Sequence, residues 1–230
     1  MNEGPDVYLR VRDKEGRLYP DDMVRRLPEV PADHPLRDEW RARARSADRI
    51  ASWIAGLPKP ARVLDLGCGN GWLASTIAAV AGAWVVGVDR NRVELDQARR
   101  VFADRGELAW IAGDIFGVSQ IGGPFDAVLL ASAIQYFPDL PRLIGRLIPM
   151  LSAAGEIHVL DSPLYPPGEL SAARERSRKY YQDLGFPEMA DHYHHHTASV
   201  LDAYNAVRLY SPGLRAGDSP FPWICLRPKE

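Results

Sequence analysis

The chain has 230 residues, of which 46% are hydrophobic and 25% charged, and its formal net charge is −2. These values are typical of a globular protein with one large domain, and they give no electrostatic reason to expect binding to nucleic acid or to an anionic membrane. The two cysteines, Cys68 and Cys225, are too few for a disulfide framework, which favours reduced thiols and a cytoplasmic protein.

Residues 1–59 are predicted to form an amino-terminal arm and a cap helix. The arm begins with charged residues where a signal peptide needs an apolar core, and the apolar stretch 77–88 is too short to span a bilayer. Apolar residues at helical spacing then mark the cap helix: Leu36, Trp40, Ala44, Ala47, Ala51 and Ile54. The stretch 37–49 has five arginines but also three acids, Asp38, Glu39 and Asp48, so we interpret it as a solvated helix face rather than a nucleic-acid patch.

From residue 60 onward, short apolar runs alternate with helical patterns, which predicts a parallel α/β sheet. The predicted strands are 61–66, 84–88, 107–112, 125–131 and 155–161. Helices are predicted to begin near Asn91, which forms a capping pair with Glu94, to cover 140–151, and to follow the fifth strand over 170–184. The predicted last two strands form an antiparallel pair at the end of the sheet: 206–213 and 221–228.

The stretch "VLDLGCGNGWLA" (63–74) combines a buried acid with a glycine-rich turn. A strand, a glycine turn and a helix in succession let a ligand lie against bare backbone at the carboxyl edge of a sheet. A dinucleotide fingerprint reads G-x-G-x-x-G, whereas this loop reads G-x-G-x-G and has Trp72 where the third glycine belongs. Asp65 would repel a pyrophosphate and suits a ligand of cationic character, although alone it could also be a structural acid that caps the turn.

This stretch resembles the first motif of the class I S-adenosylmethionine-dependent methyltransferases, and further motifs follow in the order of that family. They are "VVGVDRN" (85–91), "AGDIF" (112–116), "FDAVLLASAIQYFPDL" (125–140) and "LSAAGEIHVLD" (151–161). The resemblance implies a doubly wound, mostly parallel seven-stranded sheet with a C-terminal antiparallel strand pair and an N-terminal helical cap. It also implies a methyltransferase domain over 60–230, with an insertion at 163–205 that shapes the acceptor pocket.

The resemblance further implies how the cofactor, S-adenosylmethionine, is held. Asp89 would bind the ribose hydroxyls, Asp114 would accept from the adenine amino group, and Ile115 would pack on the adenine face. The carbonyl of Ala131 would lie near the methionyl end, and the arm could reach the methionyl carboxylate. The residues implied for cofactor binding are Asp65, Gly67, Cys68, Gly69, Gly71, Asp89, Arg90, Asp114, Ile115 and Ala131, with Tyr19 and Arg45 from the arm.

Four of the six histidines lie in "DHYHHHTAS" (191–199), and three interpretations are open for them. The segment could be a polar loop or lid, or one histidine could be a general base or orient the acceptor. The third interpretation is a metal site, because in an extended segment alternate residues share a face: His192, His194 and His196. Related methyltransferases that use a metal rely on carboxylates near the fourth strand, where this chain has Ala131 and Ser132, so we assign no metal ligand.

The candidate catalytic residues are Tyr136, Asp161, His192, His194 and His195. Tyr136 could orient the acceptor or simply pack, and Asp161 could touch the acceptor or only organise the loop after the fifth strand. His158 lies in the middle of that strand and is expected to be a packed core histidine.

These observations predict an enzyme that moves a methyl group to an oxygen, nitrogen or carbon atom of a small molecule. The chain lacks the Asn/Asp-Pro-Pro-aromatic motif of many methyltransferases that act on nucleobases or protein amides, which favours a small acceptor and no nucleic-acid or membrane partner. The alternatives are a methyltransferase acting on a macromolecule and a non-catalytic module that binds S-adenosylmethionine. An NAD-dependent oxidoreductase is disfavoured by Asp65 and Trp72.

Overall fold

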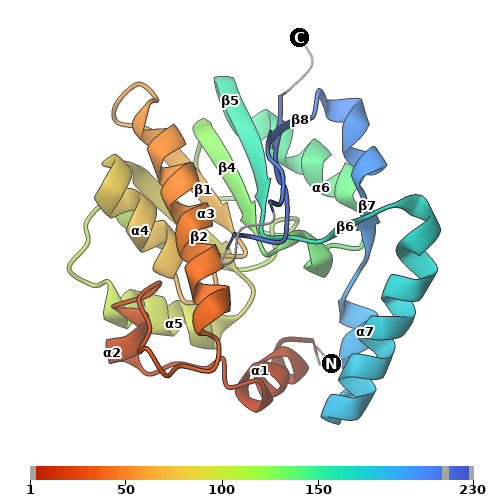
Figure 1. Cartoon of the computed structure of the whole chain (residues 1–230). Coiled ribbons are helices and arrows are strands. Elements are labelled where there is room, and N and C mark those ends of the chain that lie inside the picture. Colours follow the sequence, from red (N-terminus) through yellow and green to blue (C-terminus); the bar gives the residue numbers. More distant parts are fainter. Residues whose placement is uncertain (1–3, 214–217, 228–230) are drawn as a thin grey trace.

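A seven-stranded sheet forms the centre of the computed structural model, which describes residues 4–213 and 218–227 (Figure 1). The strands lie in the order β3-β2-β1-β4-β5-β9-β8. Their bounds are β1 (Arg62–Leu66), β2 (Trp84–Asp89), β3 (Leu108–Ala112), β4 (Phe125–Ala131), β5 (Leu151–Leu160), β8 (Val207–Tyr210) and β9 (Trp223–Leu226). β1 to β5 pair in parallel, whereas β9 pairs antiparallel with both β5 and β8. The predicted doubly wound, mostly parallel sheet with an antiparallel strand pair is confirmed.

Helices cover both faces of the sheet, so the inner parallel strands β1 and β4 are buried on two sides, whereas the edge strand β3 has no buried residue. They are α1 (Gly4–Lys14), α2 (Asp21–Val24), α3 (Arg37–Ala55), α4 (Trp72–Ala81), α5 (Arg92–Val101), α6 (Leu140–Leu147) and α7 (Leu170–Leu184). Successive residues of β1 point to opposite faces: Val63 packs with α3 and α4, and Leu64 packs with α6. In Figure 1, α4 lies to the left of the strands and α6 to their right.

Two helix predictions can be checked in detail. The cap of α5 is confirmed, because the Asn91 side chain accepts hydrogen bonds from the amides of Val93 and Glu94. The helix predicted over 140–151 was too long: α6 ends at Leu147, and a 3₁₀ turn over Ile148–Met150 leads directly into β5. Pro149 explains the difference, because proline has no amide hydrogen to donate to the carbonyl four residues earlier and so cannot continue the hydrogen bonds of an α-helix.

The amino-terminal arm divides into two parts. α3 packs in the same core as α4 and the strands, whereas α1 packs against α7 and the 3₁₀ segment η4 (Pro187–His192). Val7 and Val11 of α1 are 4% and 3% exposed and contact Tyr181 and Met189. α1 and the segment after β5 therefore meet beyond the sheet, at the lower right of Figure 1.

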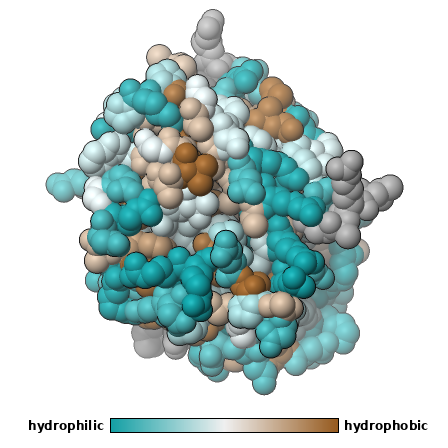
Figure 2. Space-filling model, turned by 60° about the vertical axis from the view of Figure 1, so that its left-hand side comes forward, coloured by the Kyte–Doolittle hydropathy of each residue, from teal (hydrophilic) through white to brown (hydrophobic). Residues whose placement is uncertain are grey.

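The outer surface has no large apolar area in the view of Figure 2, where small hydrophobic patches are separated by hydrophilic side chains. None of the helices in the described part of the chain has both the length and the apolar character needed to cross a membrane.

Candidate active site

A cavity of about 760 Å³ opens at the carboxyl ends of the parallel strands. This is the place where doubly wound sheets bind ligands, because the loops that follow neighbouring strands diverge there. Its walls come from the strand ends and the loops that follow them, from the first turns of α4, α5 and α6, from α3, and from the layer formed by α1 and η4.

The loop between β1 and α4 is held by hydrogen bonds to the end of β2. The amides of Gly67 and Cys68 donate to the Val88 carbonyl at 2.8 and 3.3 Å, and the amide of Gly69 donates to Asp89 Oδ2 at 2.8 Å. Gly67, Gly69 and Gly71 all have positive φ angles, of 79°, 53° and 77°, which favour glycine. These hydrogen bonds and backbone angles define the shape of the loop.

The glycines do not all serve the ligand directly, which corrects the sequence interpretation. A Cβ atom on Gly71 would lie 2.3 Å from the Trp110 ring, and one on Gly67 would lie 2.9 Å from the Cβ of Ala133. These two glycines are required by the packing of the protein itself. At Gly69 the nearest atoms to an added Cβ are the carboxylate oxygens of Glu94, at 3.5 and 3.6 Å.

Asp65 is a buried acid without a partner. It is 1% exposed, and its Oδ2 has no hydrogen-bond partner. Burial, and next the charge of Asp89, raise the pKa of Asp65 to about 7. A bare carboxylate at this depth is costly. A ligand that carries positive charge would remove that cost, so the site fits a sulfonium or ammonium compound.

The other two predicted acids line the same cavity. Asp89 accepts the amide of Asn91 at Oδ1 as well as that of Gly69 at Oδ2, and burial raises its pKa. Asp114 accepts the amide of Phe116 at 2.9 Å, and its Oδ2 lies 3.6 Å from Arg90. The structure thus brings together almost all residues expected at the cofactor: Asp65, Gly67, Cys68, Gly69, Asp89, Arg90, Asp114, Ile115 and Ala131 line the cavity, and Gly71 precedes Trp72 in its wall.

Tyr19 and Arg45 are not brought to the cavity. The Tyr19 hydroxyl accepts a hydrogen bond from Trp40 Nε1 at 3.0 Å inside a separate apolar cluster. Arg45 lies 2.9 Å from Asp218 on another side of α3. Two residues turn an α-helix by about 200°, so Arg43 faces the cavity instead, where it also pairs with Glu39 at 2.9 Å.

The histidine segment is divided between the cavity and the protein interior. His192 and His194 line the cavity, whereas His195 faces α7 and lies 2.9 Å from Ser177 Oγ. His196 Nε2 lies 3.2 Å from the Ile134 carbonyl. His192, His194 and His196, which the sequence placed on one face, therefore do not converge on a common point. The prediction that His195 could touch an acceptor is wrong, because its ring faces α7.

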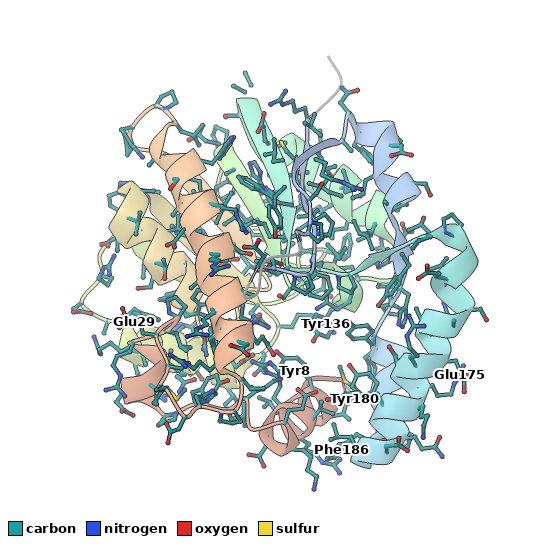
Figure 3. The ribbon with its side chains drawn as sticks, viewed as in Figure 1. Tyr8, Glu29, Tyr136, Glu175, Tyr180 and Phe186 are labelled. Carbon is teal, nitrogen blue, oxygen red and sulfur yellow. The ribbon has the colours of Figure 1, made fainter. Side chains whose placement is uncertain are left out.

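Two further candidates, Tyr136 and Asp161, line the cavity. The ring of Tyr136 meets that of Tyr8 edge to face, with 5.6 Å between centroids (Figure 3). Asp161 has a positive φ of 47°, and its Oδ1 accepts from Ser46 at 2.7 Å and Ser219 at 2.8 Å. Because both bonds go to one oxygen, Asp161 joins α3 to the loop before β9, which favours the loop-organising role for this acid.

Several cavity residues were missed at the level of sequence. Tyr8 and Arg12 reach the cavity from α1, and Met189 reaches it from η4. Glu94 was recognised only as a helix cap, but it is 5% exposed and lines the cavity, and burial raises its pKa to about 7. The sequence of α1 shows only a charged helix with two buried valines. It gives no local sign that the polar face of this helix lines a cavity at the ends of strands that begin about 50 residues later.

A group of three side chains elsewhere has the spacing of a metal site within the described residues. Glu156, His158 and Cys225 bring their ligand atoms within 4.8 Å of one another. Trp223 Nε1 donates to His158 Nδ1 at 3.1 Å, and burial lowers the pKa of His158 to about 4. The ring is then neutral with its proton on Nε2, the nitrogen that faces Glu156, and has no lone pair to offer there. His158 is the packed core histidine that the sequence predicted.

Comparison with known proteins finds a family model that matches part of the chain, and relatives that share similar stretches. A family model described as "Methyltransferase domain" matches residues 63–155. A sterol 24-C-methyltransferase of Neurospora crassa is 32% identical over 126 residues, covering 53% of this chain and 33% of that protein. A 2-phytyl-1,4-naphtoquinone methyltransferase of Synechococcus elongatus is 34% identical over 115 residues, covering 47% and 48%. The chain therefore spans half or less of these relatives.

The fold similarity extends over almost the whole chain. The structure of an O-methyltransferase family protein from Burkholderia thailandensis covers 97% of this chain and 70% of its own, with a TM-score of 0.58 and 15% identity. Residues 63–155 of this chain are therefore similar to the methyltransferase domain family, and the chain has the fold of the O-methyltransferase family protein.

Proposed function

We propose that the protein transfers a methyl group from S-adenosylmethionine to a small organic molecule. The observation that carries this proposal is the convergence of Asp65, Asp89 and Asp114, from three strand ends, on one cavity whose deepest acid has no partner. The relatives named above are methyltransferases of a sterol and of a naphthoquinone, which supports a small acceptor.

The cofactor is proposed to lie along the strand ends. Asp89 would hold the ribose hydroxyls, while Asp114 and Ile115 would hold the adenine ring. The sulfonium and ammonium charges would lie toward Asp65, and Arg43 would replace Arg45 as the contact for the methionyl carboxylate. Bound there, S-adenosylmethionine supplies an electrophilic methyl group.

The acceptor is proposed to lie between this cofactor and the α1–η4 wall. Burial, and next His192, lower the pKa of His194, so its ring is neutral at pH 7 and can accept a proton from an acceptor hydroxyl or ammonium group. The backbone amide of His194 donates to the Gln135 carbonyl at 2.7 Å, which fixes the segment against the loop after β4. We therefore propose His194 as the general base, with His192 and Tyr136 orienting the acceptor.

A non-catalytic module that binds the cofactor is the main rival, and a macromolecular acceptor is the second. Cofactor binding alone does not distinguish a non-catalytic module from an enzyme, because both need the same acids. Formation of a methylated product distinguishes them. The cytoplasmic location, the absence of nucleic-acid partners and the division at residues 59 and 60 are parts of the proposal that rest on the sequence.

Calorimetry with S-adenosylhomocysteine, followed by a screen of small phenols, amines and acids with S-adenosylmethionine, tests the proposal. We expect binding to the wild type, binding weaker by about 100-fold or more to Asp89→Ala, and no affinity for NAD. S-adenosylhomocysteine released with at least one acceptor would establish turnover. Absence of cofactor binding to the folded wild type would refute the proposal, and binding without release for any compound would favour the non-catalytic module.

A further inference from the structure

Arg12 presents an unsatisfied positive charge to the cavity. Its Nε is shielded from solvent without a hydrogen-bond partner, and the side chain makes no hydrogen bond or ion pair with any residue in the described ranges 4–213 and 218–227. The guanidinium carbon lies 5.9 Å from the centroid of the Tyr8 ring. A guanidinium carries five N–H donors in a rigid, planar arrangement. Leaving these donors without hydrogen-bond acceptors in a partly buried site is costly.

The carboxylates whose charges act on Arg12 are engaged elsewhere. Glu94 and Glu15 both act on it electrostatically. Glu94 Oε2 accepts from Asn91 at 3.3 Å. Glu15 accepts from the Tyr180 hydroxyl at 2.5 Å and lies 3.1 Å from Arg17 Nε. Neither acid makes contact with the guanidinium, so its N–H donors remain available for a ligand.

The wall around Arg12 has no carboxylate among its described lining residues. α1, the segment from Gln135 to Arg142, and η4 with the residues that follow it contribute Arg12, Arg142, His192 and His194 as their titratable nitrogen groups. The acids of the cavity come from the strand ends and from α5, and of these Glu94 acts electrostatically on Arg12: Asp65, Asp89, Glu94, Asp114 and Asp161. A ligand on the α1–η4 side therefore meets cations and aromatic rings.

Two ligands could bring a negative group to Arg12, namely the methionyl carboxylate of the cofactor and the acceptor. Arg43 on α3 already provides a guanidinium in the cavity wall beside Ser46, at the strand ends where the methionyl portion is proposed to lie. Arg12 is instead next to Tyr8, whose ring contacts Tyr136 in the segment that follows β4 (Figure 3). This placement puts Arg12 on the acceptor side.

We propose that Arg12 binds a carboxylate group of the methyl acceptor, so that the acceptor of this protein is a small organic acid. The inference rests on the proposed function, because it names the acceptor class of the same cavity. An uncharged analogue that lacks the carboxylate would leave the guanidinium donors of Arg12 without acceptors, so it would bind more weakly than the acid.

Binding of a matched pair of probes, 4-hydroxybenzoate and 4-hydroxybenzamide, tests this proposal. Each is titrated into protein saturated with S-adenosylhomocysteine, using the wild type, Arg12→Gln, Arg12→Lys and, as a control, Lys14→Gln. Lys14 is an exposed residue of the same helix, so its variant removes one charge from α1 without touching the cavity. Loss of a charge-assisted pair changes affinity by about 10-fold to 100-fold.

We expect the wild type and Lys14→Gln to prefer the acid by about 10-fold or more, Arg12→Gln to lose that preference, and Arg12→Lys to retain part of it. Equal binding of acid and amide by the wild type, or an unchanged preference in Arg12→Gln, would overturn the proposal.

Titration of S-adenosylhomocysteine and 5′-methylthioadenosine, which lacks the amino-acid portion, distinguishes the two sources of the carboxylate. We expect Arg12→Gln to bind both as the wild type does, which also shows that the variant is folded. A variant that loses affinity only for S-adenosylhomocysteine would assign Arg12 to the cofactor and overturn the acceptor assignment. Failure of the wild type to bind S-adenosylhomocysteine would instead refute the proposed function.

Discussion

The two walls of the cavity differ in charge and in origin. The cofactor wall is built from consecutive strand ends and carries Asp65, Asp89 and Asp114, while the opposite wall comes from α1, the segment after β4 and η4 and carries Arg12 and His194. Under the proposed function, the acidic wall would hold the cationic methyl donor and the other wall would hold an acid or a hydroxyl compound. With this difference, two ligands of opposite charge could be held apart by the charges of the two walls.

The largest expected effect comes from removing the proposed base on the acceptor wall. His194→Ala should lower kcat by about 10²-fold to 10⁴-fold, because general base catalysis contributes that much, and should leave affinity for S-adenosylhomocysteine unchanged. Initial rates with an acceptor found in the screen measure this. His195→Ala is the matched control, since that ring faces Ser177. Equal losses of rate and cofactor affinity would show that the two walls are not independent.

The pH dependence of the wild-type rate tests the same residue. Because the pKa of His194 is lowered, its neutral form is already present below the ordinary histidine value of about 6.5. The acidic limb of kcat/KM should therefore have an apparent pKa below that value, and the limb should disappear in His194→Ala. A limb that persists in the variant would assign it to another group.

Asp89→Ala tests the cofactor wall. It removes the acceptor of two backbone amides as well as the proposed ribose contact, so affinity for S-adenosylhomocysteine should fall by about 100-fold or more. Calorimetry measures the change and circular dichroism checks the fold. Asp96→Ala, on the exposed side of α5, is the control and should bind as the wild type does. An unchanged affinity in Asp89→Ala would contradict the placement of the ribose.

Asp65→Asn should stabilise the ligand-free protein at high pH while weakening its affinity for the cofactor. The pKa of Asp65 is raised to about 7, so the stability linked to its protonation is present below the unfolded value of about 3.9 and is lost as pH rises through 7. Between pH 5.5 and 8 this linkage amounts to about 2 kcal/mol, or roughly 4–8 °C in Tm. Thermal unfolding of both proteins at the two pH values measures it. A wild-type Tm that does not fall more than that of the variant would show that Asp65 has a partner.

The smallest expected effect concerns how α1 is held on the acceptor wall. Val11→Ala removes two methyl groups from its contact with Tyr181 and Met189 and should weaken docking by about 1–3 kcal/mol. Hydrogen exchange in α1 should accelerate with little change in global Tm, because the central sheet does not depend on this contact. Asp13→Ala, an exposed change on the same helix, should not alter exchange. If Val11→Ala lowered the global Tm as a core mutation does, α1 would be part of the main folding unit.

Much of the fold could be predicted because its signals are local. Each parallel strand is a short apolar run followed by a turn. Because these runs alternate with helical patterns along the chain, they predict a parallel sheet. The long β5 and the short α6 were not predicted correctly, because Leu151 continues the apolar spacing of the helix although Pro149 ends it. Periodicity alone does not distinguish the end of a buried helix from the start of a buried strand.

The sequence by itself determined the cofactor wall. Its acids follow successive strands, and parallel strands bring their carboxyl ends to one edge, so Asp65, Asp89 and Asp114 must lie near one another. Tertiary structure alone decided the acceptor wall. Whether Arg12, Arg43 or Arg45 faces the cavity depends on how α1 and α3 are rotated against the sheet, and that rotation is set by apolar contacts between segments far apart in the chain.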